Sequence, residues 1–143
     1  MLLIVDEAQT GLGRTGELFG INSEACDGVV PDILTLSKPL GGGMPLSALV
    51  TSVEIDEECK EKGFLFSTSH TNDPLVAAVG LKTVEIVVRD DLADNAREMG
   101  KQLLEGLRRL ERRFDCIGDV RARGLLVGLE ICLLYTSPSP RDS

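Results

Sequence analysis

The sequence predicts an α/β fold, and two patterns carry this prediction. Three short apolar runs, at residues 2–5, 33–36 and 46–50, have the length of strands. The first two end directly at polar residues, and uninterrupted apolar runs of this kind are typical of parallel strands buried on both faces of a sheet. After Pro74 the apolar residues instead recur every three to four positions, as they do on the buried face of a helix.

Two helices are expected in the second half of the chain. The first begins at Pro74, because proline suits the first turn of a helix. The second is expected from Leu92 to Phe114, and either Asp90 or Asp91 can cap it. The apolar residues that mostly share one face of the first helix are Leu75, Val76, Val79, Leu81, Val84 and Val87.

Glycine-rich stretches separate the predicted elements. Residues 11–20 are expected to form a loop, and residues 39–45 contain three consecutive glycines, which exclude regular structure there. Residues 120–123 and 125–131 are expected to be strands on either side of Gly124. The strand from Leu125 has no partner after it, which indicates that the fold stops within a domain.

The composition narrows the classes of function. A net charge of −8 argues against non-specific binding to nucleic acid, and no apolar run approaches the length of a membrane span. The four cysteines form no C-x-x-C pair and there is a single histidine, so a zinc site is not expected. Scattered cysteines are typical of reduced thiols in a cytoplasmic protein.

The opening residues 1–16 match two nucleotide-binding signatures. The apolar run ending in Asp6-Glu7 resembles a Walker B strand, but the chain contains no phosphate-binding loop of the G-x-x-x-x-G-K-[ST] type. The glycines at 11, 13 and 16 have the spacing of a dinucleotide fingerprint, but five residues separate them from the strand and no amphipathic helix follows. An ATPase stays a remote alternative that would need a phosphate loop upstream.

A third interpretation pairs Asp6 with Lys38, each placed just after a predicted buried strand. Ligands of open α/β sheets bind outside the carboxyl ends of the strands, so both residues could face one cleft. A lysine in a dry pocket can attack a carbonyl group to form a Schiff base, and an aspartate beside a pyridine nitrogen keeps that nitrogen protonated. Pyridoxal phosphate requires this pair of groups from a protein.

These residues belong to longer motifs. Asp-Glu-Ala-Gln-Thr-Gly-Leu-Gly-Arg-Thr-Gly at 6–16, Ser-Lys at 37–38 and three glycines at 41–43 occur in order, followed by characteristic stretches at 67–74 and 118–126. Together they resemble the class III aminotransferases, pyridoxal-phosphate enzymes of the aspartate-aminotransferase fold. The resemblance implies a fragment of that fold: residues 1–88 from the large cofactor-binding domain with its sheet, and residues 89–131 from a linking helix and the start of the small C-terminal domain.

The resemblance also implies roles for individual residues. Lys38 would be the catalytic residue, forming the Schiff base with the cofactor and moving a proton to or from the substrate adduct. Asp6 would pair with the pyridinium nitrogen, Ala8 would pack on the ring face, and Gln9 would bind near the phenolic oxygen. Arg14 is given a structural or dimer-surface role only.

A second loop carries further expected ligands. Ser69 stands where relatives have a threonine that reaches the cofactor phosphate of the neighbouring subunit, and Thr68 competes with it for this role. Asp73, with Ser69 and Thr71, would bind K⁺ or Na⁺, because hard oxygen donors suit such cations. Asp73 could equally cap the helix that begins at Pro74.

The loop at 69–74 and the stretch at 114–119 are closest to the 2,2-dialkylglycine decarboxylases within the family. Their reaction releases CO2 from a dialkylated amino acid and then transaminates pyruvate to alanine. The alternative is an ordinary ω-amino-acid:2-oxo-acid aminotransferase. Either enzyme would act as a homodimer or a dimer of dimers on an amino acid and a 2-oxo acid.

The resemblance stops at residue 131. Residues 132–142 resemble the translation of a transposon-end sequencing adaptor, so we expect a non-native tail at 132–143. Family members also carry a phosphate loop upstream and a carboxylate-binding arginine downstream of the matched region. The chain by itself is therefore expected to be inactive.

Overall fold

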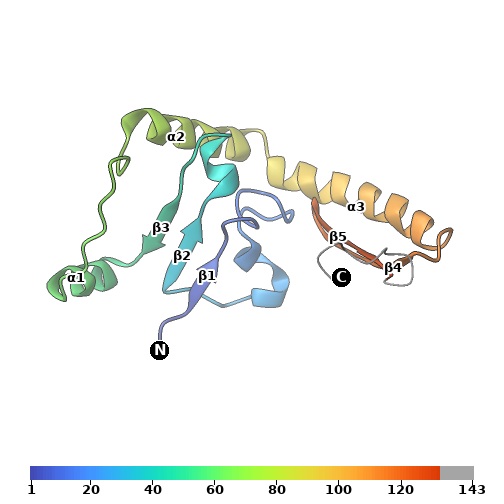
Figure 1. The fold of residues 1–143 in the computed structure, drawn as a ribbon, viewed down its shortest axis with the longest axis horizontal. Coiled ribbons are helices and arrows are strands. Elements are labelled where there is room, and N and C mark those ends of the chain that lie inside the picture. The colour runs from blue at the N-terminus through green and yellow to red at the C-terminus, as the bar shows by residue number, and fades with distance from the viewer. Residues whose placement is uncertain (133–143) are drawn as a thin grey trace, which may run out of the picture.

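The computed structural model describes residues 1–132, and it places the elements in two groups (Figure 1). One group is a three-stranded sheet with α2 above it, and the other is α3 with a two-stranded hairpin below it. The strands are β1 (Ile4–Asp6), β2 (Ile33–Leu36), β3 (Ala48–Thr51), β4 (Ile117–Arg123) and β5 (Leu126–Ile131); the α-helices are α1 (Val53–Glu61), α2 (Pro74–Arg89) and α3 (Leu92–Glu111); the 3-10 helices are η1 (Gly20–Asn22), η2 (Glu24–Cys26) and η3 (Lys38–Gly41).

The sheet is mixed rather than purely parallel. β1 pairs parallel with β2, as expected, and Asp6 lies opposite Thr35 in this register. β3 runs antiparallel to β2, with Leu36 opposite Ala48. The expectation that β1 is buried on both faces is wrong for the described residues, because Ile4 is 59% exposed and β2 is the only element that packs extensively on β1.

The two long helices begin close to the predicted positions. Asp73 is the N-cap of α2, where its carboxylate accepts a hydrogen bond from the Leu75 N–H at 3.0 Å. The single apolar face predicted for α2 is wrong in part, since Leu75 and Leu81 are exposed while Val87 is buried. Asp91 occupies the N-cap position of α3, but its side chain makes no capping hydrogen bond.

Helix α1 and the 3-10 helices were not expected. Helix α1 has no apolar face to reveal it, and it is stabilised locally by the Ser52 cap and by ion pairs between residues four apart, such as Lys60 with Asp56 at 2.5 Å. Residues 38–41 form η3, a short 3-10 helix that ends at Gly42 in the left-handed region (φ 55°). The expectation of no regular structure at 39–45 is therefore wrong for its first turn.

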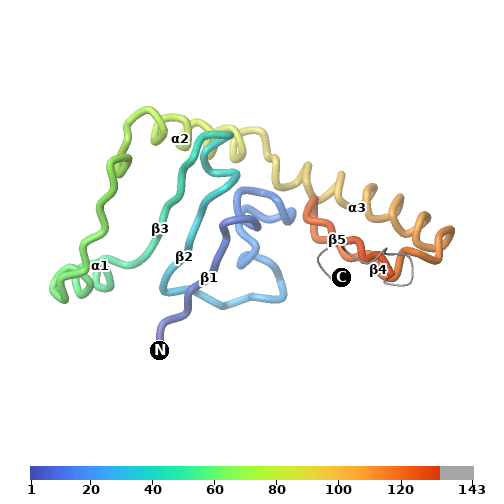
Figure 2. Tube along the Cα trace, in the orientation of Figure 1, coloured from blue at the N-terminus to red at the C-terminus, as the bar shows by residue number. Residues whose placement is uncertain are grey.

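The loop that follows β1 approaches the β4–β5 hairpin and so joins the two groups of elements (Figure 2), and glycines make this close approach possible. Gly124 forms the turn of the β4–β5 hairpin with a φ of 55°, and a Cβ there would lie 2.4 Å from the carbonyl carbon of Thr15. Gly100 of α3 faces this turn, and a Cβ on it would lie 2.2 Å from the Gly124 oxygen. Only glycine allows the hairpin, α3 and the loop at 11–16 to approach so closely.

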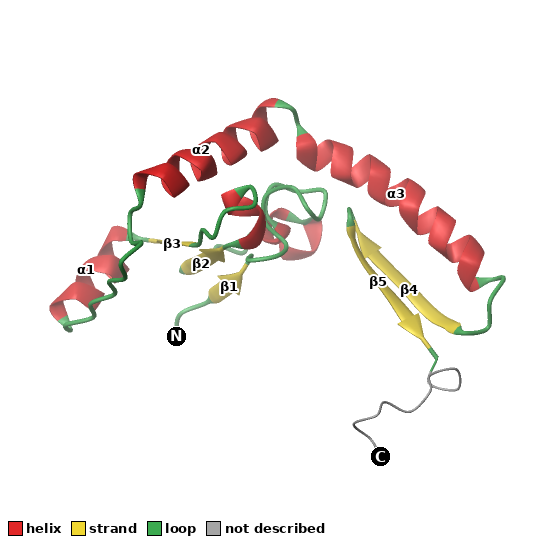
Figure 3. Cartoon of the chain, turned by 45° about the horizontal axis from the view of Figure 1, so that its top comes forward, coloured by secondary structure: helices red, strands yellow, loops and turns green. Residues whose placement is uncertain are grey.

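The core is small, and many large apolar side chains are exposed. Figure 3 shows α2 on one side of the three-stranded sheet. Leu12, Leu36 and Leu40 form the buried cluster beneath α2. No helix within residues 1–132 is long and apolar enough to cross a membrane. The expected tail at 132–143 lies outside the described residues except for Cys132. The large apolar side chains that are at least half exposed include Leu2, Ile4, Leu49, Val50, Phe64, Leu65, Phe66, Leu75, Leu81 and Val88.

We predict that residues 1–131 expressed alone will aggregate or stay partly unfolded, because uncovered apolar faces and an open sheet edge favour association. Binding of a hydrophobic dye and calorimetric melting would test this, with a full-length protein as the control. A soluble monomer that melts in one cooperative transition would contradict the prediction.

Candidate active site

Asp6 ends β1 with its carboxylate fixed by two donors. Its Oδ1 accepts hydrogen bonds from the Ala8 N–H and from the Thr35 hydroxyl, both at 2.9 Å. The bond from the Ala8 N–H, then the Thr35 bond and the nearby Lys38 charge, lower the pKa of Asp6 below its usual value. The side chain is therefore a carboxylate at neutral pH. Thr35 was not expected here, and only the parallel register of β1 and β2 reveals it.

Lys38 lies two residues beyond Leu36, the last residue of β2, and its side chain reaches the turn that follows β1. Its Nζ donates a hydrogen bond to the Gln9 Oε1 at 2.6 Å. Its backbone is in the left-handed region, with a φ of 37°, which costs a non-glycine residue about 1–3 kcal/mol. Strain of this kind concentrates at functional sites, and here it accompanies the start of η3 at Lys38.

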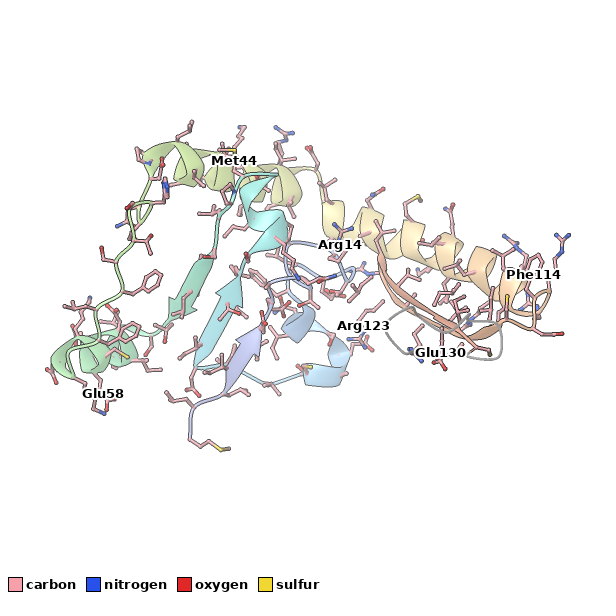
Figure 4. All side chains as sticks on the ribbon, viewed as in Figure 1. Arg14, Met44, Glu58, Phe114, Arg123 and Glu130 are labelled. Carbon is pink, nitrogen blue, oxygen red and sulfur yellow. The ribbon has the colours of Figure 1, made fainter. Side chains whose placement is uncertain are left out.

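An open pocket of about 370 Å³ contains the Lys38 side chain. Figure 4 marks Arg14 in the loop between the sheet and the hairpin, on the rim of this pocket. Its lining carries two cations and no carboxylate, although the chain as a whole has a net charge of −8. This local charge favours an anionic ligand. The lining residues are Gln9, Arg14, Lys38 and Pro39 with Leu125, Leu126 and Val127 from the hairpin.

The structure brings together only part of the predicted site. Asp6 binds the Ala8 N–H, Lys38 binds Gln9, and the Lys38 charge acts on Asp6, so these four residues lie near one edge of the sheet. Asp6 and Ala8 are not among the residues that line the Lys38 pocket. The residues predicted from the second loop, Thr68, Ser69, Thr71 and Asp73, are not part of the Lys38 pocket.

The second loop instead borders another pocket, of about 700 Å³, next to the start of α2. Thr68, Thr71 and Asp73 line this pocket, and the Thr68 N–H donates to the Thr71 hydroxyl at 2.9 Å. His70 Nδ1 lies 3.8 Å from the Asp73 carboxylate. No group of three or more His, Cys, Asp or Glu side chains within residues 1–132 could hold a metal ion.

Besides Thr35, two contributions to the site were not predicted. Glu7, next to Asp6, is only 2% exposed and binds the loop that follows it. Leu125, Leu126 and Val127 supply an apolar wall from a distant part of the chain. The Asp6-Glu7 pair could have marked Glu7, but no local signal identifies the wall.

Residues 1–137 match the model of the family described as Aminotransferase class-III. The chain belongs to the class-III aminotransferase family. This membership accounts for the glycine motif at 11–16 and replaces the ATPase and dinucleotide interpretations of the opening residues.

Two curated relatives and one solved structure show the range of similarity. The chain is 48% identical over 142 residues to an uncharacterized aminotransferase of Schizosaccharomyces pombe, covering 99% of this chain and 31% of the relative. It is 38% identical over 131 residues to a leucine/methionine racemase of Thermococcus litoralis, covering 92% of this chain and 28% of the relative. A thermostable (S)-enantioselective omega-transaminase from Thermomicrobium roseum matches with a TM-score of 0.81 and 38% identity, covering 93% and 30% of the two chains.

The chain thus spans about three tenths of the length of these relatives. Over that length its architecture is that of the corresponding part of the pyridoxal-phosphate-dependent transaminases. The relatives also show that the family includes proteins named for different reactions.

The residues at the site fit pyridoxal phosphate, the cofactor of this family. Lys38 Nζ forms no ion pair within residues 1–132 and points to an amide oxygen in the pocket, so its amine is available to an aldehyde. Asp6 is held ionised close by, as a protonated pyridine nitrogen requires. The positive lining suits an anionic cofactor and substrate.

We predict that Thr35→Val raises the pKa of Asp6, because it removes a donor that stabilises the carboxylate. As the pH is lowered, the full-length variant should therefore lose affinity for the cofactor at a higher pH than the wild type does. The control is Thr51→Val on β3, where the hydroxyl donates to the Asp32 carbonyl oxygen at 2.8 Å. The prediction would be contradicted if the wild type and both variants lost cofactor affinity at the same acidic pH.

Proposed function

We propose that the protein to which this chain corresponds uses pyridoxal phosphate to transfer amino groups between an amino acid and a 2-oxo acid. The observation that carries the proposal is the meeting of Lys38, Gln9 and the ionised Asp6 at one sheet edge, in a chain of the class-III aminotransferase family. Arg14 gives the pocket a positive charge that suits the carboxylate of an amino acid or a 2-oxo acid.

Each residue has a defined task in this proposal. Pyridoxal phosphate, when bound, supplies an electron sink for the substrate. Asp6 would stabilise positive charge at the ring nitrogen, and Gln9 would bind near the phenolic oxygen of the cofactor. Lys38 would take up and return a proton at Nζ, and Ala8 would pack against the ring. Ser69 or Thr68 would bind the cofactor phosphate of a neighbouring subunit.

We predict that Lys38→Ala lowers amino transfer by the full-length protein at least about 100-fold, the range that proton transfer contributes. Borohydride reduction of the cofactor-loaded protein and peptide mapping are expected to label Lys38. Lys60→Ala is the control, because Lys60 is exposed on α1 and pairs with Asp56. Labelling at another lysine, or full activity of Lys38→Ala, would refute the proposal.

Two more specific reactions within this family are each supported by a different observation. The sequence of the loop at 69–74 supports decarboxylation of 2,2-dialkylglycines with pyruvate as the amino acceptor. In that case the oxygens of Asp73, Thr71 and Ser69 would bind K⁺ or Na⁺, although Asp73 already caps α2. The similarity to an omega-transaminase supports the ω-amino-acid aminotransferase instead.

The two functions differ in whether CO2 is released. For the decarboxylase we expect the full-length protein to release CO2 from 2-aminoisobutyrate, at rates that differ between K⁺ and Na⁺. We expect Asp73→Asn to abolish that difference and Asp90→Asn, at the end of α2, to leave it unchanged. Amino transfer from an ω-amino acid without release of CO2 would select the aminotransferase.

We also propose that the protein is a cytoplasmic homodimer or dimer of dimers. The exposed apolar residues Phe64, Leu65 and Phe66 support an interface near the second loop. The four cysteines are free thiols, which suits a reducing compartment.

A further inference from the structure

Glu7 is a buried carboxylate that the proposed reaction does not use. Only 2% of the residue is exposed. Its Oε1 accepts a hydrogen bond from the Ile21 N–H at 2.7 Å, and its Oε2 accepts one from the Thr10 hydroxyl. The backbone at Gly20 passes directly over this carboxylate, since a Cβ there would lie 3.2 Å from Oε2.

The main chain of Glu7 also connects the start of this loop to the sheet. Its N–H donates to the Thr35 oxygen at 2.9 Å, which extends the β1–β2 ladder by one bond. Its carbonyl oxygen accepts from the Gly11 N–H at 3.1 Å and closes the turn that contains Gln9. Glu7 therefore connects the sheet edge to both ends of the segment 10–21.

The opposite side of this loop has its own attachments. The Leu125 N–H donates to the Arg14 oxygen at 2.9 Å, and Arg97 donates to the Gly16 oxygen at 2.6 Å. These bonds hold residues 14–16 to the hairpin and α3. The part of the loop nearest to Gln9 is instead anchored by the Glu7 side chain.

We propose that Glu7 is a positioning residue for the cofactor pocket, and the inference rests on the proposed function. By holding Thr10 and Ile21, the carboxylate fixes the turn in which Gln9 receives the Lys38 amine. The two donors, the Thr10 hydroxyl and the Ile21 N–H, lie on separate segments of the chain. A side chain as long as glutamate, with two polar atoms at its end, is needed to reach both. Glutamine keeps both contacts, because its oxygen accepts from Ile21 and its NH2 donates to the rotatable Thr10 hydroxyl. Alanine leaves the Ile21 N–H without its partner.

The test measures the dissociation constant of pyridoxal phosphate for the full-length apoprotein by absorbance titration, with melting temperatures recorded on the same samples. We expect Glu7→Ala to weaken binding about tenfold and Glu7→Gln to stay within about threefold of the wild type. Glu24→Ala is the matched control, because Glu24 is exposed on η2 beyond the same loop. This control should bind as the wild type does.

A double-mutant cycle with Gln9→Ala separates positioning from general stabilisation. If Glu7 acts through Gln9, Glu7→Ala in the Gln9→Ala background should weaken binding by less than about threefold. The inference would be overturned if the two substitutions raised the dissociation constant independently, so that their fold-changes multiplied in the double variant. It would also be overturned if Glu7→Gln and Glu7→Ala weakened binding equally. If Glu7→Ala does not fold, Thr10→Val replaces it in the cycle and is judged by the same criterion. A wild-type protein that does not bind pyridoxal phosphate would instead overturn the proposed function.

Discussion

The parallel pairing of β1 with β2 is the constraint on which the site depends. It sets Asp6 opposite Thr35, so that the carboxylate receives a hydroxyl donor from the neighbouring strand. Because parallel strands end at the same edge of a sheet, the segments that follow them also meet there. Gln9 then lies within hydrogen-bonding distance of Lys38. A shift of one residue in this register would turn Asp6 or Thr35 to the other face and dissolve the contact.

The glycine loop at 11–16 lies between the two groups of elements, and both groups supply residues to the pocket. Its near side is anchored at Glu7, and its far side contacts α3 and the hairpin. Close approach at Gly100 and Gly124 brings the hairpin near enough to supply an apolar wall opposite Lys38. Two glycines of the family motif also serve packing between elements, because a Cβ on Gly13 would lie 3.3 Å from the Ala93 nitrogen and one on Gly16 would lie 3.1 Å from the Arg97 Cβ, both on α3.

Open apolar faces explain most of the wrong expectations. Periodicity identifies residues that favour burial, but it does not identify what covers them. Leu75 and Leu81 on α2 and Ile4 on β1 are apolar and exposed, because the described chain provides no covering element for them. The chain spans about three tenths of the length of its relatives, and the additional length or a second subunit are the candidate covers.

The sequence by itself determined the features that depend on neighbouring residues: strand β2, the starts of α2 and α3 at Pro74 and Leu92, two strands on either side of Gly124, and the motif that led to Asp6 and Lys38. Local propensity, capping and short apolar runs encode these features directly. Tertiary structure alone decided the antiparallel direction of β3, the Thr35 bond to Asp6, the burial of Glu7, and the distance between the second loop and the Lys38 pocket. Those features depend on strand register and on contacts between residues far apart in the chain, and no local pattern specifies either.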